Sequence, residues 1–153
     1  MRNRYLIMLS AVICISLSNP VLGQDAYVKR FRPLADSLGQ VYGIPANFIL
    51  SVAVIESGRG KSRNVRLLKN HFGIAGKNNL YRTKKIRTRY KQYKTDTASY
   101  VDFCKLVTRR AFYQKLKGNE DVRLWIEAMS KTRYSEKPLL WKKNILSALR
   151  QLE

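Results

Sequence analysis

Apolar side chains recur along most of the chain at the spacing of helices that face a core. Residues 27–42 follow this pattern and end at Gly43, so they predict an amphipathic helix that stops at a glycine. Residues 44–58 predict a second helix that is apolar on most sides, which is typical of a protein interior. Pro45 suits the first position of that helix, where its missing amide proton costs nothing.

The C-terminal half continues the helical pattern. The predicted helices are residues 97–116 with a break near 109–111, residues 121–131, and residues 139–152, which Pro138 opens. Their apolar stripes, including both Trp side chains, are explained by packing in a core. The short loop at 132–136 separates the last two helices and is placed to present Tyr134 to a cleft.

Residues 77–94 depart from this pattern, because they carry eight Lys or Arg side chains and no acidic residue. Alternation over positions 86–93 predicts a strand or hairpin with one basic face. Tyr90 and Tyr93 stand among the basic residues, and such aromatic faces can pack on sugar rings in a groove. A solvated edge hairpin and a nucleic-acid surface are the alternatives. The whole pattern predicts a mainly α-helical domain with a small β-hairpin lobe.

Residues 1–23 have the pattern of a secretory signal peptide. Two arginines near the start precede an apolar run at 6–17 and a small-residue cleavage site at 21–23. The apolar run is shorter than a helix that spans a bilayer. We therefore expect an exported protein, periplasmic or extracellular, whose mature part is one domain at residues 24–153.

The formal net charge of the chain is +20, and removal of the two arginines in the signal leaves +18. A charge of this size implies an anionic partner, such as a nucleic acid, a membrane surface or an acidic wall polymer. Export argues against nucleic acid as the physiological target. Anionic polymers of the cell envelope are therefore the expected partners, and we expect the domain to be a monomer.

Few side chains are suited to metal or redox chemistry. Cys104 is the one cysteine after the signal, and its place on the apolar side of a predicted helix favours buried packing over a reactive thiol. His71 is the only histidine, whereas a zinc site usually needs three or four ligands. We therefore expect no metal and no cofactor.

Glu56 is the candidate for acid chemistry, because it ends the apolar helix just before Gly58. Apolar surroundings and the partial negative charge of a helix C-terminus both disfavour the ionised carboxylate. Its pKa should therefore be raised, as a general acid requires. The alternative is a structural ion pair with Arg59 or Lys61, since such pairs also perturb pKa values.

These segments resemble the N-acetylglucosaminidases of bacterial peptidoglycan, which form glycoside hydrolase family 73 of the lysozyme-like superfamily. Residues 56–62, ESGRGKS, are similar to the family's E-S-G-x-G-x-S segment, and residues 70–74, NHFGI, to its N-x-F-G-I segment. Weaker similarities follow in the family's order at residues 89–93, 99–103 and 134–141. The resemblance extends along the whole mature chain.

The resemblance implies a lysozyme-like helical domain that hydrolyses the β-1,4 bond after N-acetylglucosamine in peptidoglycan glycan strands. It makes Glu56 the general acid and Tyr134 a second catalytic residue, lining the cleft near the reacting sugar. Phe72 and Gly73 match a loop that shapes the cleft floor, so we expect them to bind substrate. Tyr90 and Tyr93 are added as substrate-binding residues from the aromatic pattern described above.

The chain departs from the family in lacking an acidic residue at 77–94, where many members have a proposed second carboxylate. Asp96 and Asp102 are candidates for that second carboxylate by nearness in sequence only. In a substrate-assisted mechanism, the sugar's acetamido group attacks its own anomeric carbon while Glu56 protonates the leaving oxygen. Tyr134 would then orient the acetamido group or a water.

Two other functions fit the same residues. A lytic transglycosylase shares the fold and uses a single catalytic Glu, although its loop after the catalytic helix usually differs from residues 72–74. A non-catalytic, cationic peptidoglycan-binding domain would explain both the charge and the missing carboxylate. The reaction products distinguish these functions, because hydrolysis leaves reducing ends, transglycosylation leaves anhydro ends and binding leaves neither.

Overall fold

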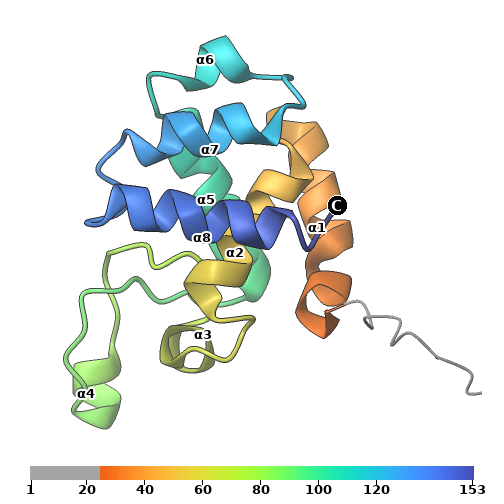
Figure 1. Ribbon diagram of the computed structural model, residues 1–153. Helices are drawn as coiled ribbons and strands as arrows, with labels where there is room; N and C mark the ends of the chain where they lie inside the picture. The colour runs from red at the N-terminus through yellow and green to blue at the C-terminus, as the bar shows by residue number, and fades with distance from the viewer. Residues whose placement is uncertain (1–24) are drawn as a thin grey trace, which may run out of the picture.

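The computed structural model describes residues 25–153, so the predicted signal peptide lies outside the described residues. Eight helices make up most of this range (Figure 1). They are α1 (Ala26–Tyr42), α2 (Ala46–Ser57), α3 (Arg63–Leu68), α4 (Leu80–Lys84), α5 (Asp96–Thr108), α6 (Tyr113–Leu116), α7 (Val122–Ser130) and α8 (Pro138–Leu149). The mainly helical prediction is confirmed.

Helix α2 is the central element, with α1, α7 and α8 packed on it (Figure 1). Eight of its twelve residues are buried, which explains why the sequence is apolar on nearly every side of this helix. Pro45 stands at the N-cap, one position before the first helical residue. Gly58 ends the helix in a left-handed conformation with φ of 55°, and its amide donates back to the last turn. Glu56 is thereby fixed in the last turn.

The predicted break near residues 109–111 is confirmed, since α5 ends at Thr108 and α6 begins at Tyr113. Helix α5 turns its apolar side into the core, where Phe103 and Cys104 have no exposed surface. Burial raises the pKa of the Cys104 thiol to about 12. The thiol therefore stays protonated at neutral pH, as a packing residue should.

The expected β-hairpin is not confirmed. Within residues 25–153, β-pairing is limited to one isolated bridge between Ala75 and Tyr90, flanked by a few backbone hydrogen bonds between the same two extended arms. The arms are joined by α4 at the tip of a separate lobe (Figure 1). Asn78 explains the missing ladder, because its side-chain amide donates to the Thr88 and Tyr90 carbonyls that a paired strand would use.

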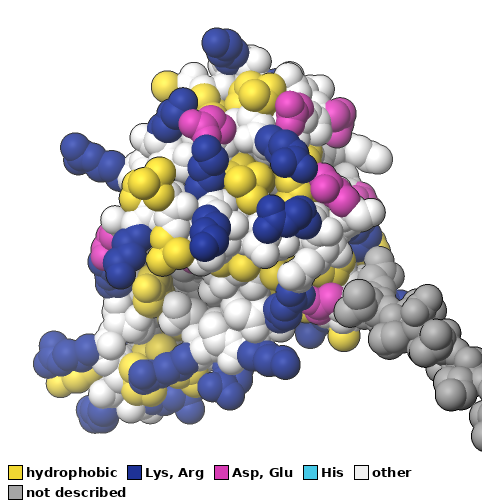
Figure 2. Space-filling view, viewed as in Figure 1, with side chains coloured by type: hydrophobic (Ala, Val, Ile, Leu, Met, Phe, Trp, Pro, Cys, Tyr) yellow, Lys and Arg dark blue, Asp and Glu magenta, His cyan; other side chains and the backbone are white. Residues whose placement is uncertain are grey.

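Basic side chains cover much of the surface. Figure 2 shows Lys and Arg spread over the whole visible face, with a concentration on the lobe that carries α4. No helix within residues 25–153 is long and apolar enough to cross a bilayer.

Candidate active site

Glu56 is a half-buried carboxyl group at the end of α2, held by the indole of Trp141 from α8. The Trp141 Nε1–H donates to Glu56 Oε1 at 2.8 Å. Burial raises the pKa of Glu56, and the hydrogen bond from Trp141 partly opposes that rise. The predicted direction of the pKa shift is therefore found, with burial as its main cause.

The alternative ion pair of Glu56 is not formed within residues 25–153. Arg59 instead contacts Asp25, the N-cap of α1, and Gln151, which follows α8. No ion pair in the described part of the chain involves Lys61 or Glu56. Glu56 is therefore a buried acid without a basic partner among these residues.

Glu56 opens into a cleft of about 680 Å³ between the helical body and the lobe. Four of the predicted site residues line this cleft together with it: Phe72, Gly73, Tyr90 and Tyr134. They come from segments far apart in the sequence, so only the fold brings them together. A cleft that contains a buried acid and aromatic walls can hold a sugar and protonate its leaving oxygen.

Asn70 holds the loop that forms one wall of the cleft. Its buried side chain donates to the carbonyls of Ile74 and Lys91 and accepts from the amides of Phe72 and Ile74. These four bonds use the amide group fully and define the path of the backbone through Gly73. Asn70 begins the NHFGI segment, but the sequence pattern alone did not predict this role.

Gly73 brings the loop backbone against the Glu56 carboxyl. Its φ is 64°, and a Cβ at this position would lie 3.4 Å from Glu56 Oε2. Only glycine adopts this conformation readily and leaves that oxygen unobstructed. The residue before it, Phe72, stacks on Phe103 with ring centroids 4.2 Å apart and is buried. Phe72 thus anchors the loop in the core, while Gly73 leaves Glu56 Oε2 unobstructed.

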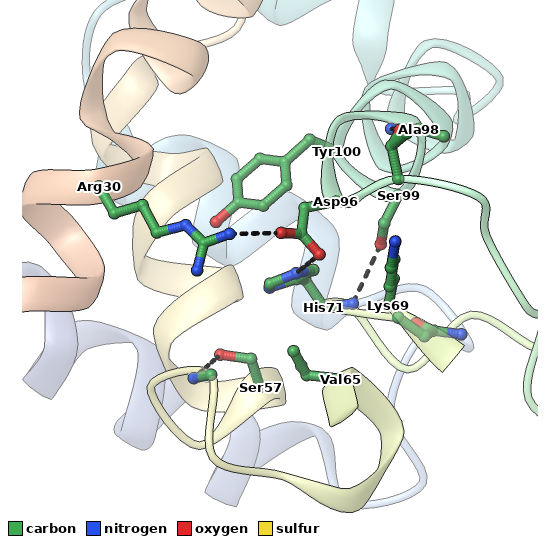
Figure 3. Close-up of polar contacts among 12 residues, drawn as sticks. Arg30, Ser57, Val65, Lys69, His71, Asp96, Ala98, Ser99 and Tyr100 are labelled. Atoms are coloured by element: carbon green, nitrogen blue, oxygen red, sulfur yellow. Dashed lines mark hydrogen bonds and ion pairs between the residues drawn. The ribbon is translucent and has the colours of Figure 1, made fainter. Parts of the chain in front are cut away.

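A polar network centred on the buried His71 holds the same loop in place (Figure 3). His71 Nδ1 and the Tyr27 hydroxyl lie 2.7 Å apart, and His71 Nε2 is 3.1 Å from an Asp96 oxygen that α5 contributes. Arg30 of α1 donates to the other Asp96 oxygen at 2.8 Å. Burial lowers the pKa of His71, which favours its neutral form. The network ties the loop to α1 and α5.

Tyr134 links the loop at 132–137 to the wall formed by Phe72. Its hydroxyl donates to the Phe72 carbonyl at 2.6 Å, and its ring lies 5.7 Å from the Trp141 ring, centroid to centroid. Burial and the nearby Glu56 carboxyl raise the pKa of Tyr134 well above its ordinary value. The phenol therefore stays a neutral hydrogen-bond donor in the cleft.

Tyr93 lies outside the cleft, in contrast to Tyr90. Its side chain is 8% exposed and its hydroxyl donates to Asp102 at 2.7 Å, so neither face nor hydroxyl is available to a sugar. The physical reason is that residues three apart in an extended segment point to opposite sides. The two tyrosines therefore cannot both face the groove.

The two candidates for a second carboxylate, Asp96 and Asp102, form hydrogen bonds outside the cleft. Asp96 belongs to the network behind the loop, and Asp102 accepts from Lys91 and Tyr93 at 2.7 Å each. The carboxylate that does line the cleft with Glu56 is Glu136, which pairs with Arg89 at 3.1 Å. Sequence reasoning missed Glu136, although its position two residues after Tyr134 was a usable signal.

Trp141 was also missed, because an apolar stripe on a helix is explained by packing alone. In the structure, the indole N–H of Trp141 donates to Glu56 while its ring packs in the core. Within residues 25–153 there is no cluster of His, Cys, Asp and Glu that could hold a metal ion.

Comparison with solved structures gives close agreement in fold. A peptidoglycan hydrolase from Sphingomonas sp. A1 is 27% identical, covering 83% of this chain and 91% of that chain, with a TM-score of 0.62. The glycoside hydrolase domain of Salmonella typhimurium FlgJ superposes with a TM-score of 0.64 over 82% and 86% of the two chains. At 20% identity, this second likeness concerns the fold alone.

Among curated protein sequences, none is detectably similar to this chain. Residues 32–153 match the glucosaminidase family, described as mannosyl-glycoprotein endo-beta-N-acetylglucosaminidase. This range includes every residue that lines the cleft. The chain therefore belongs to the glucosaminidase family, family 73 of the glycoside hydrolases, as its Glu56 segment indicated.

Proposed function

We propose that this protein hydrolyses the β-1,4 bond after N-acetylglucosamine in peptidoglycan, with Glu56 as the general acid. The observation that carries the proposal is the buried Glu56 carboxyl, held by Trp141 at the cleft that Tyr90 and Tyr134 line. The Sphingomonas relative is a peptidoglycan hydrolase, which supports the same polymer as substrate here.

The geometry of Glu56 supports a division of labour between its two oxygens. Oε1 accepts the hydrogen bond from Trp141, while Oε2 faces the backbone of Gly73 in the cleft. Oε2 is then the oxygen that carries the proton to the glycosidic oxygen. Transfer of that proton lets the sugar C1–O bond break as the leaving strand departs as an alcohol.

We further propose that the reaction is substrate-assisted. As the C1–O bond to the leaving strand breaks, the carbonyl oxygen of the 2-acetamido group attacks C1 to form a cyclic oxazolinium. A water then attacks C1 and gives its proton to the Glu56 carboxylate, which opens the ring to the reducing sugar and restores the acid. Supporting this, Asp96 and Asp102 are both held outside the cleft. Tyr134 keeps a neutral hydroxyl near the reacting centre, where it can exchange its Phe72 partner for the acetamido group.

Glu136 supplies the competing mechanism, because it is the second carboxylate of the cleft. A two-carboxylate reaction would use it as base or nucleophile once its pair with Arg89 opens. Strands whose acetamido carbonyl has been removed by deacetylation distinguish the two. Unchanged cleavage of those strands would exclude substrate assistance and favour Glu136.

The decisive experiment is a digest of purified sacculi by the protein and by its Glu56→Gln variant, with products identified by mass spectrometry. We expect new reducing N-acetylglucosamine ends that the variant does not release. Anhydro-muramyl ends would instead identify a lytic transglycosylase. Binding without release by either protein would identify a non-catalytic binding domain.

We propose in addition that residues 24–153 are the exported, mature domain and that it acts as a monomer in the cell envelope. The +18 charge of this range supports attraction to anionic envelope polymers. Detection of the protein with a new N-terminus at residue 24 in an envelope fraction tests the export proposal.

A further inference from the structure

Arg110 lines the same cleft as Glu56, at the turn between α5 and α6. The backbone of this turn is fixed, because the Arg110 amide donates to Val107 and its carbonyl accepts from Tyr113. The side chain therefore leaves from a rigid point. Its positive charge partly opposes the rise in the pKa of Tyr134, which lines the same cleft.

The Nε–H of Arg110 is buried and has no hydrogen-bond acceptor among residues 25–153. Arg110 also takes part in none of the ion pairs in this range. A buried donor without an acceptor is unfavourable, so the protein itself leaves part of the hydrogen-bonding capacity of this guanidinium unused.

The cleft itself offers no carboxylate that is free to do so. Glu56 accepts from Trp141 and has a raised pKa, and Glu136 is paired with Arg89. Two further cations, Arg133 and Lys137, line the same cleft. The surroundings of Arg110 are therefore strongly positive and favour an anionic ligand group.

We propose that Arg110 is a specificity residue whose guanidinium binds a carboxylate of the glycan substrate in the cleft. A guanidinium prefers a carboxylate to any neutral acceptor, because it can donate two parallel charge-assisted hydrogen bonds. This inference rests on the proposed function. In peptidoglycan the carboxylate has two sources, namely the lactyl group of a peptide-free muramic residue or the stem peptide.

Equilibrium binding tests the proposal. All proteins carry Glu56→Gln so that strands stay intact, and dissociation constants are measured near physiological salt for three substrates. These are peptide-free glycan strands with free lactyl carboxylates, the same strands converted to methylamides, and strands with intact stem peptides. Arg110→Gln is compared with Arg109→Gln, a neighbouring exposed arginine that does not line the cleft.

We expect the parent to bind carboxylate-bearing strands about tenfold more tightly than methylamide strands, as one charge-assisted bond allows. Arg110→Gln should lose this preference and Arg109→Gln should keep it. Arg110→Lys should also lose most of it, because an ammonium retains the charge without the planar fork. Tighter binding of peptide-free or of peptide-bearing strands identifies the lactyl group or the stem peptide as the source.

The proposal is overturned if the parent shows no preference, if Arg110→Gln keeps it, or if Arg109→Gln loses as much. Thermal unfolding of each variant establishes that the folded protein is being compared. Release of reducing ends by the protein with Glu56 intact is scored separately. Its absence would overturn the proposed function, while the dissociation constants would still decide the role of Arg110.

Discussion

At the scale of single residues, the chemistry of the site depends on how Glu56 is surrounded. Burial raises its pKa, whereas the hydrogen bond from Trp141 stabilises the ionised form and lowers that pKa. Burial is the larger effect. A general acid works only while protonated, so activity should fall as the pH rises through the Glu56 pKa.

Replacement of Trp141 by Phe should move the alkaline limb of the pH–rate profile upward. The change removes the donor that stabilises the carboxylate, so the Glu56 pKa rises further. The profile of kcat/KM against pH measures this shift. Trp125→Phe is the control, because Trp125 is also buried but donates to the Asn119 carbonyl. An alkaline limb that stays in place would contradict the role of Trp141.

Gly73→Ala should lower kcat by at least about tenfold, because even a small displacement at a reacting centre is costly. The new methyl group would lie 3.4 Å from Glu56 Oε2 in a backbone with positive φ. Gly118→Ala is the matched control, since its φ is also positive, at 79°, but nothing lies within 4 Å of the new Cβ. Both variants should lose about 1 kcal/mol of stability in urea unfolding from the backbone alone. Equal effects on kcat would show that the contact with Glu56 is unimportant.

At the scale of elements, periodicity predicted the helices well and the lobe poorly. Helix α2 and the break after α5 follow from apolar spacing and glycine, which are local properties of the sequence. The lobe depends on Asn78, whose side chain takes backbone acceptors in a way that no periodicity reveals. Alternation likewise could not indicate which of Tyr90 and Tyr93 faces the cleft, because that depends on the partner segment.

The residues of the site divide in the same way. Glu56 was found because its own helix creates its surroundings, and Tyr134 and the loop at 72–73 came from the family resemblance. Three other segments supply Arg110 and Glu136, which line the cleft, and Trp141, which donates to Glu56. The roles of these residues therefore depend on tertiary packing. From their local sequence alone, these three residues are expected only to pack in the core or to face solvent.

Asn70→Ala should destabilise the protein by about 2–4 kcal/mol, because it leaves buried amides and carbonyls of the loop without partners. Asn78→Ala is the matched comparison: it removes a similar bridge to two carbonyls within the lobe, but away from Glu56. Urea unfolding and kcat should be measured together for both variants. We expect Asn70→Ala to lose activity even where it is fully folded, and Asn78→Ala to keep most of it. Full activity in folded Asn70→Ala would show that the loop finds its path without this side chain.

At the scale of the whole molecule, the excess of positive charge is the dominant property. Eight ion pairs connect Lys or Arg with Asp or Glu within residues 25–153, yet basic residues far outnumber acidic ones. Such a surface attracts a polyanionic envelope from a distance and concentrates the protein on it. Glu56 itself lies in a half-buried site, where salt screens charges less than it does at the surface. Binding to the polymer and catalysis should therefore respond differently to salt.

Binding to purified sacculi should weaken steeply between low and high salt, while kcat on short neutral oligosaccharides should change little. The lobe should account for much of this dependence, because α4 stands on the segment that also forms a cleft wall. Lys84→Gln with Lys85→Gln removes two charges from this lobe. Lys115→Gln with Lys117→Gln removes two exposed charges near α6, at the opposite end of the molecule (Figure 1). Because screening limits surface charges to about 10 Å, the first pair should reduce binding and its salt dependence more than the second. Equal losses from both pairs would mean that the polymer responds to total charge and does not extend from the cleft over the lobe.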